Sequence, residues 1–136
     1  MSYELRGHTA DVAVSATGDT LGETFAAVAD GMAGAMAEEW PADGDRSDVS
    51  AAAGNLEALL FDYLDELIYE RDVHSVLPVD NAGIVRETAN GWAFEGSYRG
   101  VPLSAVVARD LKAVTYSEMS IEETSTGWRA YVVFDV

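Results

Sequence analysis

The stretch from Asn55 to Asp72 reads N-L-E-A-L-L-F-D-Y-L-D-E-L-I-Y-E-R-D, and it has the pattern of an amphipathic helix. Its apolar residues recur at steps of three and four, the period of one helix face; they are Leu56, Leu59, Leu60, Leu64, Leu67 and Ile68. Asn55 is suited to be the N-cap, because its side-chain oxygen can accept from the first free backbone N–H groups. Such a helix needs a sheet or another helix to cover its apolar face.

A second helix is predicted from Thr20 to about Ala37. Thr20 and Glu23 have the spacing of a capping box, in which each side chain satisfies a free N–H group at the start of the helix. The apolar positions continue at helical spacing; they are Leu21, Phe25, Val28, Ala29, Met32 and Met36.

Extended segments surround these two helices. They are predicted at residues 3–6, 12–16, 74–79, 84–88, 92–98, 111–121 and 128–136. Asn90-Gly91 predicts a hairpin, because this dipeptide tolerates the positive φ of a type I′ turn. Residues 47–53 are ambiguous and residues 103–108 are unassigned. The order of elements predicts one α+β domain over residues 1–136, a two-layer sandwich of a mixed, mostly antiparallel sheet with two helices packed on one face.

Composition narrows the class of protein further. The chain of 136 residues is 49% hydrophobic, which favours a folded core, and it has no cysteine for a disulfide or thiolate metal site. We find no apolar run long enough for a membrane span and no apolar signal region after Met1. These features predict a cytoplasmic protein without a membrane partner.

The net charge is −16, from 24 acidic and 8 basic residues. Such a surface repels phosphate backbones, so direct binding to nucleic acid is not expected. Two explanations remain open: an acidic functional surface, or adaptation to a halophilic interior, where the Debye length is about 3 Å at 1 M salt. The scattered acids and the single lysine favour the second.

Carboxylates at strand ends are the best candidates for chemistry. The glycines fit no phosphate loop or dinucleotide motif, and no nucleophile elbow occurs. Asp11 precedes one predicted strand, and Asp135 adjoins the terminal carboxylate of Val136. If these strands pair, the three groups meet and offer hard oxygen ligands for Ca²⁺ or Mg²⁺. The alternative is that each is a solvated turn residue.

Two further side chains are candidate contacts. Lys112 is the only lysine, and its ammonium can engage a phosphate or a partner carboxylate; a simple salt bridge is the alternative. His8, beside Gly7, is either a proton carrier or an ordinary hydrogen-bonding loop residue.

Five segments in order resemble the archease family across nearly the whole chain. They are Gly7-His8-Thr9-Ala10-Asp11-Val12, Thr20-Leu21 with Phe25-Ala26, Leu59 to Leu67, Leu111-Lys112-Ala113-Val114-Thr115-Tyr116 and Val133-Phe134-Asp135-Val136. Gly7 departs from the acidic residue common before the histidine, and Ser117 from the histidine that many members carry.

The resemblance implies a non-catalytic accessory protein of the RtcB-type RNA-splicing ligase, which joins tRNA halves using GTP and Mn²⁺. Archeases are implied to promote guanylylation and repeated turnover of that ligase. The family's metal site, read as Ca²⁺, maps onto Asp11, Asp135 and Val136, and Lys112 and His8 become candidate contacts for the ligase or its nucleotide.

Three alternatives stay open. One is a general chaperone that holds unfolded proteins, another is a modulator of RNA-modifying enzymes, and the third is a metal-dependent hydrolase using the same carboxylates. The metal's identity, the oligomeric state and the participation of Glu118 or Asp62 in the site are also open.

Overall fold

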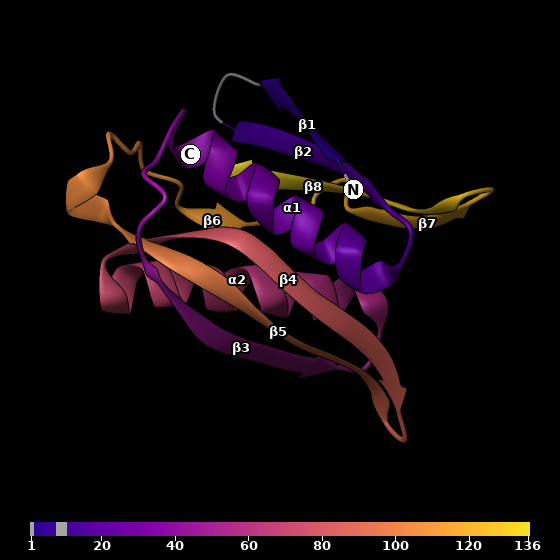
Figure 1. Cartoon of the computed structure of the whole chain (residues 1–136). Helices are drawn as coiled ribbons and strands as arrows, with labels where there is room; N and C mark the ends of the chain where they lie inside the picture. Colours follow the sequence, from indigo (N-terminus) through magenta and orange to yellow (C-terminus); the bar gives the residue numbers. More distant parts are fainter. Residues whose placement is uncertain (1, 8–10) are drawn as a thin grey trace.

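A computed structural model of the chain describes residues 2–7 and 11–136. Within these ranges two α-helices and eight strands alternate, with one short 3₁₀ turn (Figure 1). In chain order the elements are β1 (Ser2–Gly7), β2 (Asp11–Gly18), α1 (Leu21–Met36), β3 (Asp45–Ala53), α2 (Leu56–His74), β4 (Val76–Thr88), β5 (Gly91–Pro102), η1 (Leu103–Ala105), β6 (Ala113–Val114), β7 (Ser120–Thr124) and β8 (Gly127–Asp135). Neither helix in the described part of the chain has the length and apolar character needed to cross a membrane.

The strands form two sheets. The first has the order β1-β2-β8-β6, with β7 also pairing with β8, and the second has the order β3-β5-β4. Every pairing within the described residues is antiparallel. The predicted α+β class is therefore confirmed, with two antiparallel sheets in the place of one mixed sheet.

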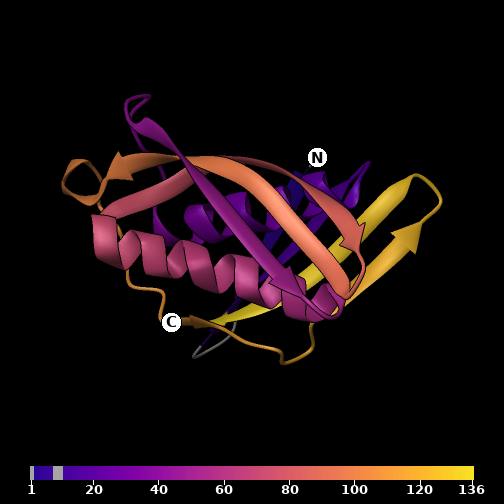
Figure 2. The same ribbon diagram turned by 90° about the horizontal axis from the view of Figure 1, so that it is seen from below.

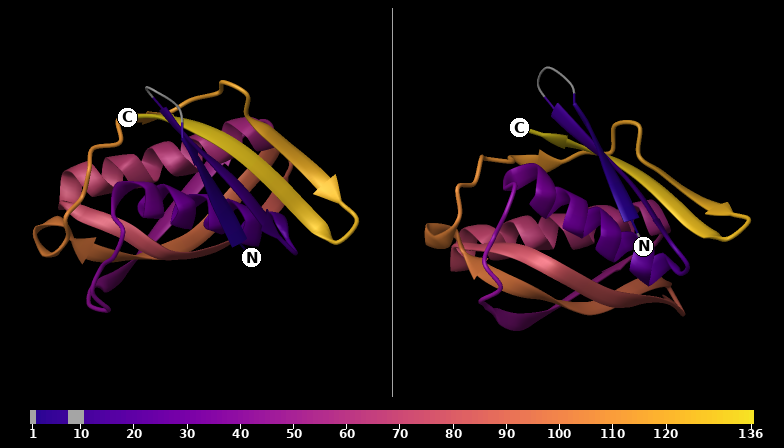
Figure 3. Two further views of the ribbon diagram at one scale, coloured as in Figure 1. Left: turned by 90° about the horizontal axis from the view of Figure 1, so that it is seen from above. Right: turned by 45° about the horizontal axis from the view of Figure 1, so that its top comes forward.

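Helix α1 lies between the two sheets, in contact with β2 on one side and β4 on the other (Figures 1 and 3). Small residues make this position accessible, because α1 is rich in alanine and glycine and is buried nearly all round. A Cβ on Gly22 would collide with the backbone of Gly83 in β4, and one on Gly31 would collide with Val14 in β2. The absence of side chains at these two glycines lets both sheets approach the helix closely.

Helix α2 packs on the same face of the second sheet as α1. The ring of Phe94 in β5 stacks on Tyr63 of α2 at a centroid distance of 4.0 Å and on Phe25 of α1 at 6.4 Å. Figure 2 shows α2 running along this sheet. The predicted placement of two helices on one face of a sheet is thus confirmed, and the first sheet adds a further layer over α1.

Both predicted helix starts are confirmed. Asn55 Oδ1 accepts from the Ala58 N–H at 2.8 Å, and Thr20 Oγ1 accepts from the Glu23 N–H at 3.1 Å. The Glu23 carboxylate accepts in return from the Asp19 N–H at 3.1 Å, one residue earlier than the capping box predicted.

The predicted hairpin between β4 and β5 is also confirmed, but its turn differs. Thr88 pairs with Gly91, so the connecting residues are Ala89 and Asn90, and the positive φ belongs to Gly91 at 149°. Strand β4 is continuous where two segments were predicted, because a bulge between Val79 and Ala82 absorbs the polar residues there.

The ambiguous segment at residues 47–53 belongs to strand β3. The predicted extended segment over residues 111–121 is largely irregular, because only β6 and the beginning of β7 pair with β8. Between them the chain makes a turn in which the Met119 N–H donates to the Tyr116 carbonyl at 3.1 Å.

Candidate functional site

The start of β2 and the end of the chain lie side by side (Figure 3). Asp11 is directly opposite Asp135 in the β2–β8 register, and Ala113 of β6 is opposite Asp135 on its other side. The Lys112 N–H donates to the Asp135 carbonyl at 2.8 Å. We call Asp11, Asp135 and Val136 the acidic tip. The predicted pairing that brings Asp11 next to Asp135 is confirmed, and Val136 directly follows Asp135 in the chain.

The packing below the acidic tip explains its position. Directly opposite residues in an antiparallel pair project to the same face, so Asp11 and Asp135 share one face of the sheet. Their neighbours Val12, Phe134 and Val114 project to the other face, where all three are buried in the core. The core therefore fixes the backbone, while Asp135 stays exposed and Asp11 is half-buried.

The donor atoms at the acidic tip suit a hard cation. Two aspartate carboxylates and the terminal carboxylate of Val136 are oxygen ligands of the kind that Ca²⁺ and Mg²⁺ prefer. Within residues 2–7 and 11–136 no three His, Asp or Glu side chains form a metal-ligating cluster.

The other predicted site residues have different positions. Lys112 has its backbone fixed to β8 and its side chain exposed next to the acidic tip. Asp62 lies on the exposed side of α2, and Glu118 lies in the turn before β7 with a φ of 58°. The strand register does not bring either acid to the tip. His8 lies outside the described residues.

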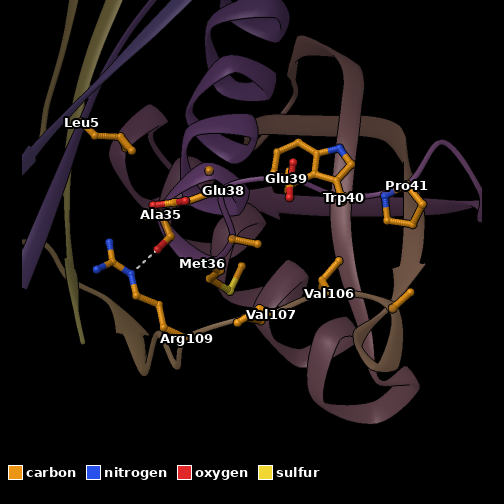
Figure 4. A pocket seen from close by; sticks show the side chains of 14 residues that line it. Leu5, Ala35, Met36, Glu38, Glu39, Trp40, Pro41, Val106, Val107 and Arg109 are labelled. Carbon is orange, nitrogen blue, oxygen red and sulfur yellow. Dashed lines mark hydrogen bonds between the residues drawn. The ribbon is translucent and has the colours of Figure 1, made fainter.

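A groove of about 1000 Å³ lies at the same end of the molecule, which sequence reasoning missed. Its walls come from β1, the C-terminal end of α1, the loop after α1 and the segment after η1 (Figure 4). The residues that line it include Leu5, Glu38, Glu39, Trp40, Val107 and Arg109. A tryptophan directly after two glutamates is the one signal in the sequence that points to this groove.

The fold and the acidic tip define an α+β domain with two helices, two antiparallel sheets and a carboxylate pair at the chain end. The chain matches the model of the Archease protein family over residues 3–136. It is 32% identical to the archease of Methanosarcina acetivorans over 142 residues, which cover 98% of this chain and 95% of that protein. The archease of Thermococcus kodakarensis is also 32% identical, with 98% of both chains covered. The chain therefore belongs to the archease family.

Solved structures agree with this assignment. The solution structure of protein 1598 of Methanobacterium thermoautotrophicum has a TM-score of 0.79 and 26% identity, and the match covers 99% of both chains. A crystal structure from Thermotoga maritima, described as an archease and possible chaperone, shares the fold with a TM-score of 0.64 at 19% identity.

Proposed function

We propose that this protein is a non-catalytic activator of an RtcB-type RNA-splicing ligase in tRNA splicing, and that it promotes guanylylation and repeated turnover through the acidic tip. Membership of the archease family supports the class of partner. The direct pairing of Asp11 with Asp135 at the chain end is the observation that carries the proposal. Like charges directly opposite each other on a sheet repel, and a bound cation would offset that repulsion.

The residues at the acidic tip would have two roles, to hold a cation and to bind a phosphate. Asp11, Asp135 and the terminal carboxylate of Val136 would hold a Ca²⁺ ion. Such an ion supplies positive charge that can attract nucleotide phosphates or ligase carboxylates. Lys112, held beside Asp135 by the 2.8 Å backbone hydrogen bond, presents an ammonium that can bind a phosphate as a point charge. Because its net charge of −16 repels RNA, this protein would not bind the RNA itself, and the ligase would do so.

Multiple-turnover ligation of RNA by the cognate ligase tests this proposal. Asp11→Ala and Asp135→Ala should each abolish the stimulation, because each removes one of two paired ligands, while circular dichroism stays like that of the wild type. Asp43→Ala is the matched control, since Asp43 is an exposed acid in the loop before β3. If both tip variants stimulate ligation as well as the wild type does, the proposed role of the acidic tip is wrong.

Calorimetric titration of the isolated protein with Ca²⁺ tests the metal separately. Wild type and Asp43→Ala should bind Ca²⁺, and both tip variants should lose at least tenfold in affinity, about 1.4 kcal/mol. Equal affinity in all four proteins would place the ion elsewhere.

A general chaperone function is the second candidate, and exposed apolar side chains favour it. Ile84 is 60% exposed and Val107 is 96% exposed. This function predicts that the protein suppresses aggregation of unrelated unfolded proteins and that Asp11→Ala leaves the suppression unchanged. Loss of ligase stimulation without loss of aggregation suppression would separate the two functions.

A further inference from the structure

The groove beside the acidic tip has an acidic rim without internal partners. Glu38 and Glu39 are exposed, and neither makes a hydrogen bond or ion pair within the part of the chain that the structure describes. Figure 4 shows both at one side of the groove together with Trp40, while Val106, Val107 and Arg109 line the other side. Two carboxylates are therefore available to a ligand from outside.

Among the described residues that line the groove, Arg109 is the one cation, and it is already engaged. The Arg109 guanidinium donates to the Ala35 carbonyl, and the Arg109 N–H donates to the Met36 carbonyl at 2.8 Å. These contacts cap the C-terminal end of α1, where the helix dipole places partial negative charge. The positive charge of Arg109 thus offsets the partial negative charge at the end of α1. The charges in the groove that have no partner among the described residues are those of Glu38 and Glu39.

The groove wall is held in place from beneath. Arg71 of α2 is buried, and its guanidinium donates to the Leu111 carbonyl at 2.7 Å and to Met36 Sδ at 3.3 Å. These bonds connect α2 both to the end of α1 and to the segment that carries Val107. The groove is consequently a fixed feature of the fold.

Apolar and aromatic groups complete the groove. Val107 is 96% exposed and Leu5 is 41% exposed, and both lie on the groove wall. Half-buried Trp40 offers an aromatic face on which a cationic group can rest. Exposed apolar side chains beside unpaired carboxylates are typical of a surface that binds a partner.

We propose that this groove binds a segment of a partner protein that combines a basic residue with an adjacent apolar residue. The basic side chain reaches Glu38, Glu39 and Trp40, and the apolar side chain covers Val107. A second copy of this chain does not fit, because it carries the same net charge of −16. The groove repels RNA for the same reason.

The position of the groove identifies which partner to test. Arg109 in the groove and Lys112 beside the acidic tip are separated by only two residues. Leu5 in the groove lies two residues before the end of β1. The groove and the acidic tip are therefore at the same end of the molecule. A ligase that receives the tip would also face the groove. The identity of the partner, though not the chemistry of the groove, rests on the proposed function.

Binding to the cognate ligase and stimulation of ligation, measured over a series of protein concentrations, test the groove. Glu38→Gln with Glu39→Gln should weaken binding about tenfold, since two exposed charge contacts are lost. Val107→Ser should weaken binding about fivefold, because an apolar contact is lost while the net charge is unchanged. Both variants should still reach the wild-type maximum of stimulation at higher concentration, whereas Asp11→Ala should abolish stimulation at every concentration.

The control is Glu87→Gln with Glu123→Gln, which removes two exposed acids from β4 and β7. The β4–β5 hairpin and β7 lie at the opposite end of the molecule from η1 in Figures 1 and 2, and η1 borders the groove. This control should bind like the wild type. The wild-type affinity should also fall more steeply with added KCl than that of the Glu38/Glu39 variant, a difference that a misfolded groove would not produce.

The outcomes separate the two proposals. If the groove variants bind the ligase as tightly as the wild type while stimulation persists, the groove inference is overturned and the proposed function stands. If the wild type binds without stimulating ligation, the proposed function falls, and weaker binding of the groove variants still supports the groove. If the wild type does not bind the ligase at all, both are overturned.

Discussion

The carboxylate of Asp30 connects helix α1 to strand β4 of the second sheet. Its Oδ1 accepts from the Asn81 backbone N–H at 3.0 Å and from Asn81 Nδ2 at 2.9 Å. Asn81 is buried at the β4 bulge and donates also to the Pro78 carbonyl at 3.3 Å. Burial raises the pKa of the Asp30 carboxyl above 3.8, and the hydrogen bonds from Asn81 oppose this shift.

The raised pKa of Asp30 predicts a pH dependence of stability. As pH rises above 3.8, the unfolded chain ionises at this residue before the folded chain, so the Asp30 contribution to the free energy of unfolding falls until the folded pKa is passed. Asp30→Asn retains an acceptor for Asn81 and does not ionise. Urea denaturation from about pH 3 to about pH 7 should therefore show the variant gaining stability relative to the wild type as pH rises. Parallel profiles would contradict this prediction.

At the scale of elements, the position of α1 depends on two kinds of contact. Gly22 meets the backbone of β4, which cannot move without disturbing the sheet. A Cβ on Gly34, twelve residues later, would meet only the outer end of the Tyr3 side chain, nearest at its hydroxyl, and Tyr3 is 41% exposed. The same helix therefore contains one glycine that the fold requires and one that it can replace.

These two glycines form a matched pair for mutagenesis. Gly22→Ala should lower the free energy of unfolding by about 2 kcal/mol, because the new methyl group collides with backbone. Gly34→Ala should be neutral or stabilising by up to about 1 kcal/mol, because alanine favours the helix and Tyr3 can turn away. Thermal and urea unfolding of both variants provide the comparison, and equal stability of the two would refute a close contact between α1 and β4.

The excess of acidic residues affects the stability of the whole molecule. The formal charge of −16 already counts all eight basic residues, so the acids remain in large excess even where ion pairs form. Two such pairs are Arg86 with Glu95 at 3.2 Å and Arg129 with Glu122 at 2.7 Å. Both pairs are exposed, so each contributes little. Mutual repulsion among the remaining acids opposes the compact state at low salt.

Salt should therefore stabilise the folded protein. The midpoint of thermal unfolding should rise between about 0.1 M and about 3 M KCl, with most of the rise at the lower concentrations where screening changes most. A variant with several exposed acids replaced by their amides should show a smaller rise. A wild-type midpoint that is independent of KCl would contradict the prediction of a salt-adapted surface.

Local interactions made much of this protein predictable from its sequence. The helices, their caps at Thr20 and Asn55 and the β4–β5 hairpin depend on residues within a few positions of one another. Five short motifs spread along the chain indicated the family. The acidic tip followed from carboxylates at two predicted strand ends and the assumption that these strands pair, and the family resemblance implied the same residues. The register of Asp11 with Asp135 confirms the pairing.

Only the tertiary structure decided how the strands divide. Two sheets rather than one, and a helix between them, result from pairings between residues far apart in the chain, such as β3 with β5. No local pattern encodes these pairings, because they are selected by the total apolar area that the layers bury together. The groove has the same origin, since it is built from β1, α1 and the segment after η1, which only folding brings together.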